Sequence, residues 1–329
     1  MKNDIKIAVI IVNYKTAELV INCIGSLWTE TANYSNMQII VVDNASGDSS
    51  KERLDAEIKN RGWASRITVL AEDKNLGFAA GNNAGLKHVL KTDPDTDYFW
   101  LLNPDTIVRS GALEALVEHM NASPASGIAG SAMFGPNGAV QPSAYNFYSP
   151  IGEIWESGLV MRMTNKLFSK YIISPPFKNV PHECDWLVGA SLFVRKAVFD
   201  SIGLLDDGYF LCFEDVDFCY RAKRAGWAVW YLPESRIMHF GGISTIHSKT
   251  YRKPVYWHDS RRRLFIKFYG LSGLFLADLC RSFGIIAIFM ISLFNIAKRS
   301  LVGLGRLWFF DIRGLLGGRP KYRDGSVKK

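Results

Sequence analysis

The sequence predicts a doubly wound α/β fold, with helices on both faces of a sheet, followed by a C-terminal helical segment. Two observations carry this prediction. Apolar runs at residues 7–12, 39–42 and 98–102 are typical of strands buried on both faces, and residues 67–70 indicate a further strand. Segments with apolar residues at helical spacing separate these runs, and such an alternation of strand and helix indicates a parallel sheet.

Composition and charge limit the class of protein. The chain has 329 residues, of which 48% are hydrophobic and 21% charged, as is ordinary for a globular protein. Residues 249–329 hold 17 Lys and Arg against 4 Asp and Glu, whereas residues 1–248 hold 22 against 27. A basic tail on a nearly neutral body predicts an anionic partner, either phospholipid or nucleic acid.

Cysteine usage and the N-terminal segment indicate a reducing compartment. The five cysteines are scattered and form no C-x-x-C pair, so the sequence indicates neither a disulfide framework nor a zinc site. The apolar run at residues 5–12 is short, contains Lys6, and is followed by Asn13-Tyr14 rather than by a small-residue cleavage site. We expect a first strand there, not a signal peptide.

The next elements follow in order. Thr16 is positioned to cap a helix that continues to residue 28, and the strand at 39–42 ends in a polar loop before a helix at about 50–60. The strand at 67–70 precedes a helix on which Gly77, Gly81 and Gly85 share one face, which permits close approach of backbone or ligand. The spacing is neither that of G-x-G-x-x-G nor that of a P-loop.

The turn at residues 103–105, Asn-Pro-Asp, ends the apolar strand at 98–102. A carboxylate at the C-terminal end of such a strand lies where open α/β sheets bind ligands. One carboxylate together with substrate phosphates suffices for Mg²⁺ or Mn²⁺, so Asp105 is a candidate metal ligand. The alternative is that Asn-Pro-Asp is only a favourable turn.

The middle of the chain is irregular. A helix at 113–120 and a short strand at 127–130 precede residues 134–182, where six prolines interrupt any periodicity. A connection of this length inside a domain is usually a binding loop or lid. Regular structure is predicted to resume at residues 186–194.

A second group of acids, Glu214, Asp215 and Asp217, opens a helix that ends at Gly226. Acids in a first turn stabilise the helix dipole, and Asp217 is spaced to pair with Arg221, which is a purely structural explanation. However, an apolar aromatic stretch precedes the acids, and carboxylates beside apolar walls are where a general base is tuned. Both interpretations stay open.

His239 and the C-terminal tail each have two interpretations. His239 follows a strand at 228–232 and precedes two glycines; it is either structural or a metal ligand. A basic helix is predicted at 255–269, followed by an apolar segment at 271–297. Its longest uncharged piece, 282–297, is too short to span a bilayer. This segment is either interfacial on anionic lipid or a hairpin that packs on the core or on a second subunit.

Taken together, the motifs resemble those of the family 2 glycosyltransferases with the GT-A fold, within their bacterial rhamnosyltransferase-like branch. The resemblance covers about residues 5–270, and six motifs that agree in order are more specific than any one of them. The matching stretches are 10–14, 41–46, 75–83, 102–105, 214–217 and 239–244. The implied fold is a Rossmann-like mixed sheet with helices on both faces.

The resemblance also implies roles for individual residues. The nucleotide-sugar ligands would be Asn13, Asp43, Asn75, Asn82 and Asn103; the catalytic acids Asp215, as base, and Glu214; and the ligands of Mn²⁺ or Mg²⁺ Asp105 and His239. The sequence departs from the family's D-x-D element, because Asn103 stands where the first Asp is expected. Only one carboxylate remains there, and His239 would complete the protein ligands.

The implied function is sugar transfer by a single displacement with inversion, because there is one base and no nucleophilic partner. No Q-x-x-R-W element follows Asp217, which favours the addition of one or a few sugars. The favoured reaction moves L-rhamnose from dTDP-rhamnose to a glycan or lipid-linked acceptor of the cell surface, at the cytoplasmic face of the membrane. The alternatives are a UDP-hexose or UDP-galactofuranose donor, or a non-catalytic sugar-nucleotide or glycan-binding protein. No nucleic-acid motif is present, and an oligomer stays open.

The expected domains are residues 1–248, with a nucleotide-sugar half at 1–131 and an acceptor half at 132–248, followed by a basic helical extension at 249–329.

Overall fold

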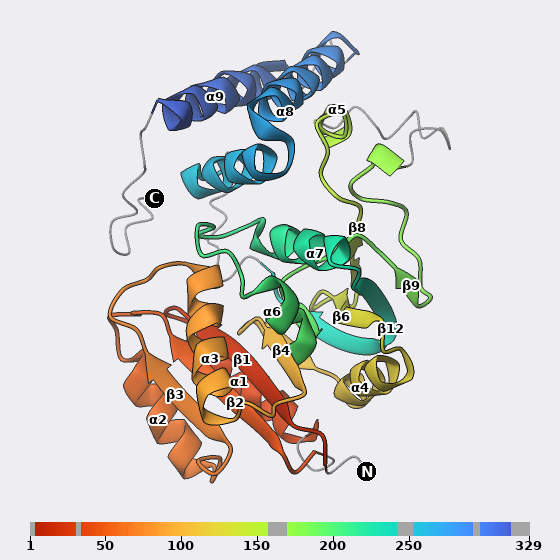
Figure 1. Cartoon of the computed structure of the whole chain (residues 1–329). Helices are drawn as coiled ribbons and strands as arrows, with labels where there is room; N and C mark the ends of the chain where they lie inside the picture. The colour runs from red at the N-terminus through yellow and green to blue at the C-terminus, as the bar shows by residue number, and fades with distance from the viewer. Residues whose placement is uncertain (1–3, 31–33, 157–169, 242–252, 292–296, 317–329) are drawn as a thin grey trace. The chain divides into compact units, whose positions relative to one another are not determined.

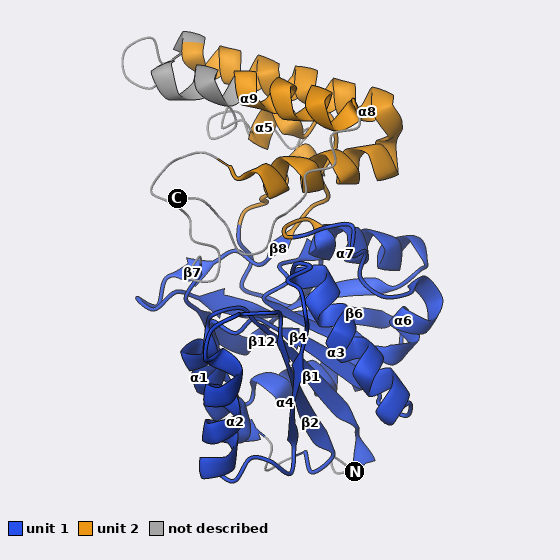
Figure 2. Cartoon of the chain, turned by 90° about the vertical axis from the view of Figure 1, so that its left-hand side faces the viewer, with its two compact units in different colours: residues 1–144, 177–210, 214–247 blue, residues 145–176, 211–213, 248–329 orange. Residues whose placement is uncertain are grey.

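A computed structural model of the chain describes residues 4–30, 34–156, 170–241, 253–291 and 297–316. The chain forms two compact units (Figure 2). Unit 1 comprises residues 1–144, 177–210 and 214–247, and unit 2 comprises residues 145–176, 211–213 and 248–329. The division expected from the sequence had one boundary, at residue 248. The structure differs in that two segments from the middle of the chain cluster with the C-terminal part.

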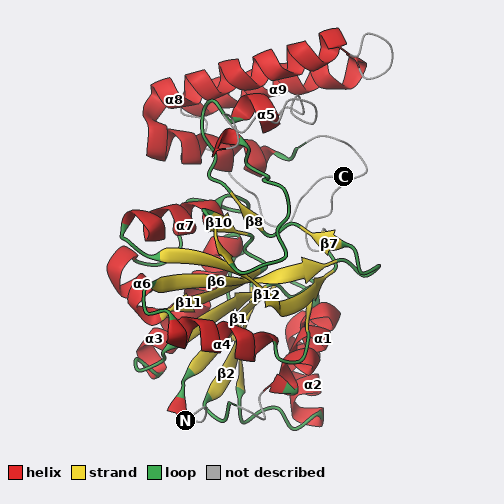
Figure 3. Ribbon diagram, turned by 90° about the vertical axis from the view of Figure 1, so that its right-hand side faces the viewer, coloured by secondary structure: helices red, strands yellow, loops and turns green. Residues whose placement is uncertain are grey.

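Unit 1 is built on a mixed sheet (Figure 3), of which ten strands lie in the described part of the chain. Eight of them follow the order β3 (Ile67–Ala71), β2 (Met37–Asp43), β1 (Ile7–Asn13), β4 (Tyr98–Leu102), β11 (Ser191–Arg195), β6 (Ser126–Phe134), β12 (Ala228–His239) and β5 (Thr106–Val108). Off this path, β7 (Val140–Gln141) pairs with β6, and β9 (His182–Glu183) pairs with β12. The remaining short strands are β8 (Ala144–Tyr145) and β10 (Trp186–Leu187).

The four strands predicted from apolar runs form the parallel half of this sheet. β1 pairs in parallel with β2 and with β4, and every residue of β1 is buried. Such burial explains why the run shows no alternation of polar and apolar residues. β11 is antiparallel to both β4 and β6, and this makes the sheet mixed.

Helices cover both faces of the sheet in unit 1; α1 and α2 lie on one face and α3 and α6 on the other (Figure 2). Their bounds are α1 Ala17–Trp28, α2 Ser50–Asn60, α3 Phe78–Thr92, α4 Ala112–Ala122, α6 Lys196–Ile202 and α7 Glu214–Arg224. Ile7, Val9 and Ile11 belong to the core cluster that includes residues of α1, α2 and α4. Alternate β1 residues therefore serve opposite faces.

The glycine face of α3 packs against β1. A Cβ atom at Gly81 would lie 2.8 Å from Val12 Cγ1, and one at Gly85 would lie 2.6 Å from Ile10 Cγ2. The close approach expected at these two positions is therefore an approach of helix to strand, and no ligand is needed to explain it.

Several local expectations differ from the structure. Thr16 precedes α1, but its hydroxyl donates to Asn13 Oδ1 at 3.1 Å and does not cap the helix. β12 continues to His239, so this residue ends a strand and does not lie on the glycine loop; residues 242–244 of that motif lie outside the described residues. Part of the irregular connection, residues 157–169, also lies outside them.

Unit 2 contains α5 (Glu153–Glu156), α8 (Val255–Ile291) and α9 (Ala297–Leu315), labelled in Figure 1. α8 changes direction at Gly270, whose φ of 69° and ψ of −175° are not helical. This break divides α8 where the sequence predicted a boundary between two segments. Phe265, Leu274 and Ala277 form a small buried cluster on α8.

Candidate functional site

The candidate residues on β1, β2, β4 and β12 lie at one edge of the sheet. Asn13 and Asp43 end the parallel strands β1 and β2, and the turn at 103–105 follows β4, which is parallel to β1. β4 and β6 are both antiparallel to β11, and β12 is parallel to β6. His239, at the end of β12, therefore lies at the same carboxyl edge, where open α/β sheets bind ligands.

Asn13 and Asp43 are hydrogen-bonded to each other. Asn13 Nδ2 donates to Asp43 Oδ1 at 2.6 Å and to Ser46 Oγ at 3.1 Å, and Asn13 Oδ1 accepts from Thr16. Ser46 Oγ donates to the same oxygen of Asp43 at 2.5 Å. The side chain of Asn13 is thus engaged within the protein, where it orients the Asp43 carboxylate.

Asn75 and Asn82 belong to the segment that begins α3. Asn75 Oδ1 accepts hydrogen bonds from Asn44 Nδ2 and from the Gly77 N–H, both at 3.0 Å. Asn82 is 1% exposed, and its Nδ2 donates to Phe78 O at 2.9 Å, within its own helix. Of the two predicted ligands, Asn75 is the more accessible.

Asp105 and His239 come together through the pairing of β5 with β12, in which His239 is opposite Thr106. Asp105 is 2% exposed, and its Oδ1 lies 3.4 Å from His239 Nε2 without a hydrogen-bond partner. Gln141 Nε2 donates to His239 O at 3.1 Å, which directs Gln141 Oε1 at His239 Nδ1, 3.2 Å away. His239 Nδ1 is therefore the donor in that contact.

This arrangement fits a cation. Because Nδ1 donates to Gln141, Nε2 is the ring atom that presents a lone pair to Asp105 Oδ1, and two acceptors face each other. A metal ion bound by both atoms would satisfy them. Among the residues that the structure describes, no cluster of three or more His, Cys, Asp or Glu side chains could hold a metal. Asp105 and His239 would thus be two protein ligands, with substrate phosphate supplying others.

Asn103 occupies the turn between β4 and Asp105. Its N–H donates to Ala190 O at 3.0 Å, while its side-chain Oδ1 is buried without a hydrogen bond. Ala190 follows Gly189, whose N–H donates to Asp215 Oδ2 at 2.9 Å. The segment before β11 therefore connects the Asn-Pro-Asp turn to the acids of α7.

Glu214 and Asp215 begin α7, as the sequence predicted. Asp215 Oδ1 accepts from the Val216 N–H at 2.8 Å, whereas Glu214 Oε2 is buried without a partner. Asp217 is fully buried, and its Oδ2 accepts from Arg221 Nε at 2.7 Å. The i,i+4 pair predicted for Asp217 is confirmed, and Asp217 is a structural residue.

The two acids at the start of α7 have different electrostatic surroundings. Burial raises the pKa of Asp215 to about 6, and the N–H groups of Gly189 and Val216 limit the rise. Burial, followed by the charge of Asp215, raises the pKa of Glu214 well above its ordinary value. Asp215, whose carboxylate accepts the two backbone N–H groups, is therefore the member of this pair that is suited to carry the negative charge at neutral pH.

The loop before α7 is held against the start of α3. The Phe78 N–H donates to Phe210 O at 2.8 Å, and a Cβ atom at Gly77 would lie 2.1 Å from the same oxygen. Gly77 also has a φ of 95°. Only glycine satisfies both conditions, so the first glycine of the motif brings the Asn75 loop beside the segment that leads to Asp215.

Sequence reasoning missed several residues that shape the site. Gln141 orients His239, Gly189 binds Asp215, Asn44 binds Asn75, and Asn83 makes two hydrogen bonds with the Leu205 backbone. Gln141 lies in the irregular connection, where no periodicity predicted its position. Asn83 adjoins Asn82 in the same motif, and the sequence holds no signal that separates their roles.

Comparison with known proteins was made by sequence and by structure. The profile of a family described as "Glycosyl transferase family 2" matches residues 8–187. An N-acetylglucosaminyl-diphospho-decaprenol L-rhamnosyltransferase of Mycobacterium tuberculosis is 25% identical over 64% of this chain and 68% of its own length. A dTDP-rhamnosyl transferase of Shigella flexneri is 22% identical over 70% of this chain and 68% of its own length.

Among solved structures, a mannosyltransferase from Pyrobaculum calidifontis in complex with GDP-Man and Mn²⁺ matches 94% of this chain and 87% of its own, with a TM-score of 0.53 and 13% identity. At this identity the likeness concerns the fold, and it confirms the predicted GT-A architecture.

Proposed function

Because the chain belongs to glycosyl transferase family 2, we propose that it transfers L-rhamnose from dTDP-rhamnose to a glycan or lipid-linked acceptor, with inversion and with a divalent metal. The observation that carries this proposal is the pair of facing acceptors, Asp105 Oδ1 and His239 Nε2, at the carboxyl edge of the sheet. Such a pair suits a cation next to a diphosphate. Mn²⁺ or Mg²⁺ bound there would neutralise the charge that develops on the departing nucleotide.

Asp215 is the proposed general base. Its carboxylate is ionised at neutral pH, and its pKa of about 6 is close enough to neutrality for efficient proton transfer. The acceptor hydroxyl gives its proton to Asp215 while its oxygen bonds to the anomeric carbon, and the bond from that carbon to the diphosphate oxygen breaks. A single displacement of this kind inverts the anomeric configuration.

The donor side of the site is proposed at Asn13, Asp43, Asn75, Asn82 and Asn103. The hydrogen bonds of these residues support unequal roles within the proposal. Asp43 and Asn75 would contact the nucleotide sugar, whereas Asn13 orients Asp43 and Asn82 supports the start of α3. The rhamnosyl donor is supported by the two relatives named above. UDP-hexose and UDP-galactofuranose are the alternative donors.

A nucleotide-release assay tests the proposal. The purified chain is given dTDP-rhamnose, UDP-glucose or UDP-galactofuranose, with Mn²⁺, Mg²⁺ or EDTA, and a membrane lipid extract as acceptor. We expect release from dTDP-rhamnose that needs a divalent metal and is lost in Asp105→Ala and Asp215→Asn. Asp55→Asn, which changes an exposed acid on α2, is the matched control.

The outcomes separate the alternatives. Release from a UDP-sugar instead would keep the mechanism and change the donor. Full activity of Asp215→Asn would refute the proposed base, and donor binding without turnover in every arm would favour a sugar-nucleotide binding protein.

A further inference from the structure

Unit 2 presents two helical segments side by side. The part of α8 after Gly270 lies along α9, as Figures 1 and 2 both show. Trp308 Nε1 on α9 donates to Ser282 Oγ on α8 at 3.0 Å, and the rings of Phe275 and Trp308 meet edge to face with their centroids 5.8 Å apart. The two helices therefore form one layer.

One side of this layer is apolar and exposed. We define the apolar layer by six side chains: Phe275, Leu279, Phe283 and Ile286 on α8, and Phe309 and Ile312 on α9. The spacing of four, four and three residues on α8 places its members in one stripe. Phe283, Phe309 and Phe275 are 62%, 58% and 56% exposed, which is unusual for the largest apolar side chains.

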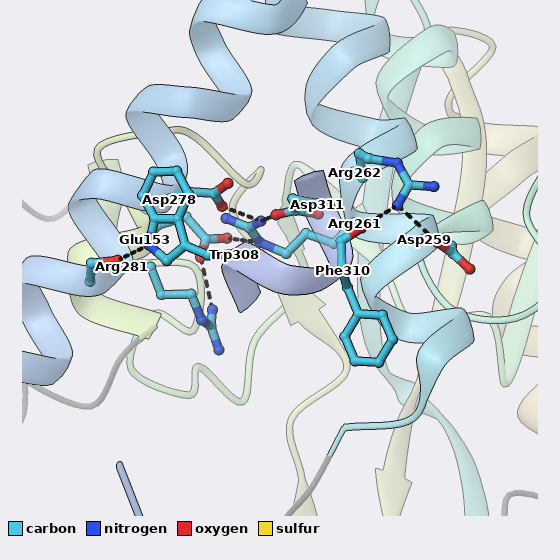
Figure 4. Close-up of polar contacts among 10 residues, drawn as sticks. Glu153, Asp259, Arg261, Arg262, Asp278, Arg281, Trp308, Phe310 and Asp311 are labelled. Atoms are coloured by element: carbon cyan, nitrogen blue, oxygen red, sulfur yellow. Dashed lines mark hydrogen bonds and ion pairs between the residues drawn. The ribbon is translucent and has the colours of Figure 1, made fainter. Parts of the chain in front are cut away.

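The opposite side of the same helices is charged and buried. Arg261 is fully buried, and its guanidinium contacts Glu153 at 3.3 Å, Asp278 at 2.8 Å and Asp311 at 3.2 Å (Figure 4). Arg281 binds the second oxygen of Glu153 at 2.8 Å. This network, called the Arg261 network below, joins α5, both parts of α8, and α9.

The Arg261 network restricts how α8 can be oriented at a lipid bilayer. By length and composition, residues Val255–Phe289 would suffice to cross a membrane, although one such helix is weak grounds for a span. A helix that spans the bilayer would carry Asp278 and Arg281 into hydrocarbon, separated from Glu153 and Asp311 on other segments. Keeping the network intact requires α8 to lie flat, with only its apolar stripe in contact with lipid.

The described parts of α8 and α9 have a positive outward charge. Three acids lie in residues 253–291 and 297–316, and each is paired with an arginine: Asp259 with Arg262, and Asp278 and Asp311 with Arg261. Arg263, Lys267 and Arg313 are exposed. Arg313 adjoins Ile312 of the apolar layer on α9, and an apolar face beside a cation complements an anionic bilayer surface. The same charges would repel one another if two copies of the chain met through this face.

We propose that the apolar layer of α8 and α9 docks flat on an anionic lipid bilayer, and that Phe283 and Phe309 insert at the level of the headgroups. The proposal goes beyond sugar transfer, because it concerns a surface that lies outside the candidate site.

Vesicle flotation tests the proposal with the full chain. Wild-type protein is mixed with vesicles of phosphatidylcholine, with or without phosphatidylglycerol, and we expect it to float with the anionic vesicles. Phe283→Ser combined with Phe309→Ser should lower the partition coefficient at least about tenfold, because both changes remove inserted apolar surface. Val180→Ser is the matched control, since Val180 is also exposed, at 56%, but belongs to unit 1.

Three measurements make the outcome decisive. Equal thermal melting of all proteins shows that the exposed substitutions leave the fold intact. Equal flotation of the double variant and wild type would overturn the proposal. So would a wild-type dimer in light scattering that does not float and that the double variant dissociates, since the occupant would then be a second copy. Flotation needs no turnover, so this test stands apart from that of the proposed function.

Discussion

Among single side chains, Asp215 makes the sharpest prediction about chemistry. As the proposed base it must be ionised, and burial sets its pKa at about 6. We therefore expect the transfer rate to fall about tenfold per pH unit below pH 6, because protonated Asp215 cannot accept the hydroxyl proton. A pH–rate profile under saturating donor measures this. A rate that is flat from pH 7 to pH 5 would contradict the assignment.

Removal of the carboxylate is the companion experiment. Asp215→Asn should lower the transfer rate by about 10²–10⁴-fold, the usual contribution of a positioned base. The residual rate of this variant should no longer show the decline below pH 6. Binding of the donor, measured by calorimetry, should change little, because Asp215 is assigned to the acceptor hydroxyl.

Asn83 makes a prediction about stability. Its side chain donates to Leu205 O at 2.8 Å and accepts from the Leu205 N–H at 3.1 Å, and all of these groups are buried. Asn83→Ala should lower the free energy of unfolding by roughly 2–3 kcal/mol, because it leaves a buried donor and a buried acceptor without partners. Asn82→Ala, on the same helix, removes one bond and should cost about 1 kcal/mol. Urea unfolding compares them, and equal losses would contradict the account.

Asn82 and Asn83 show what the sequence can and cannot predict about a single residue. The sequence predicted a polar motif before and within α3, and both side chains are present and buried. It could not assign their partners, because Asn83 bonds a residue 122 positions away. The same holds for Gln141 and His239, which are 98 positions apart. Residue type indicates chemistry, whereas partners depend on the tertiary fold.

Among helices and strands, the packing of α3 on β1 gives a prediction with an internal control. Gly85→Ala would place a Cβ atom 2.6 Å from Ile10 Cγ2. We expect a loss of about 1–3 kcal/mol in unfolding free energy, because this helix–strand contact has no space for a methyl group. Gly25→Ala on α1, with nothing nearer than 3.8 Å, should instead stabilise by up to about 1 kcal/mol. Urea unfolding measures both, and a neutral Gly85→Ala would contradict the packing argument.

The strands divide into those that the sequence predicted well and those that it did not. β1, β2 and β4 were predicted because burial on both faces makes them apolar runs. In β3 only Ile67 is buried, and its short run of Ile, Thr, Val and Leu predicted the strand without burial on both faces. β12 was predicted only in its first part, since Pro233, Glu234 and Arg236 interrupt the apolar pattern where its register with β6 shifts. Beyond this shift the strand continues to His239, and no local pattern predicts the continuation.

In the chain as a whole, the division into two compact units was the least predictable feature. The sequence placed one boundary by a change in charge, at residue 248. In the structure, residues 145–176 join unit 2, and Glu153 binds arginines 108 and 128 positions later. Charge composition indicates a distinct C-terminal segment, but it cannot indicate which earlier segment supplies the acid that its arginines need.

The Arg261 network also makes the stability of the whole molecule depend on pH. Two arginines face three carboxylates in it, so one carboxylate is in excess. Burial, followed by the charge of Asp278, raises the pKa of Asp311 to about 8. Burial raises the pKa of Glu153 too, but Arg261 and Arg281 outweigh this and hold it below its ordinary value. Asp311 is therefore the neutral member at pH 7.

The direction in which stability changes with pH follows from the pKa of Asp311 in the folded and in the unfolded chain. Its folded pKa of about 8 exceeds its ordinary value of 3.8, so the folded chain binds more protons between these values, and the stabilisation is lost as pH rises through this window. The loss reaches at most about 1.4 kcal/mol per pH unit. Asp311→Asn cannot ionise, so relative to wild type it should gain stability steadily from pH 5 to pH 8. Melting temperatures across this range measure the difference, with Asp55→Asn as a surface control. If the melting temperatures of wild type and Asp311→Asn changed in parallel with pH, Asp311 would already be ionised in this range. The buried network would then hold one uncompensated negative charge.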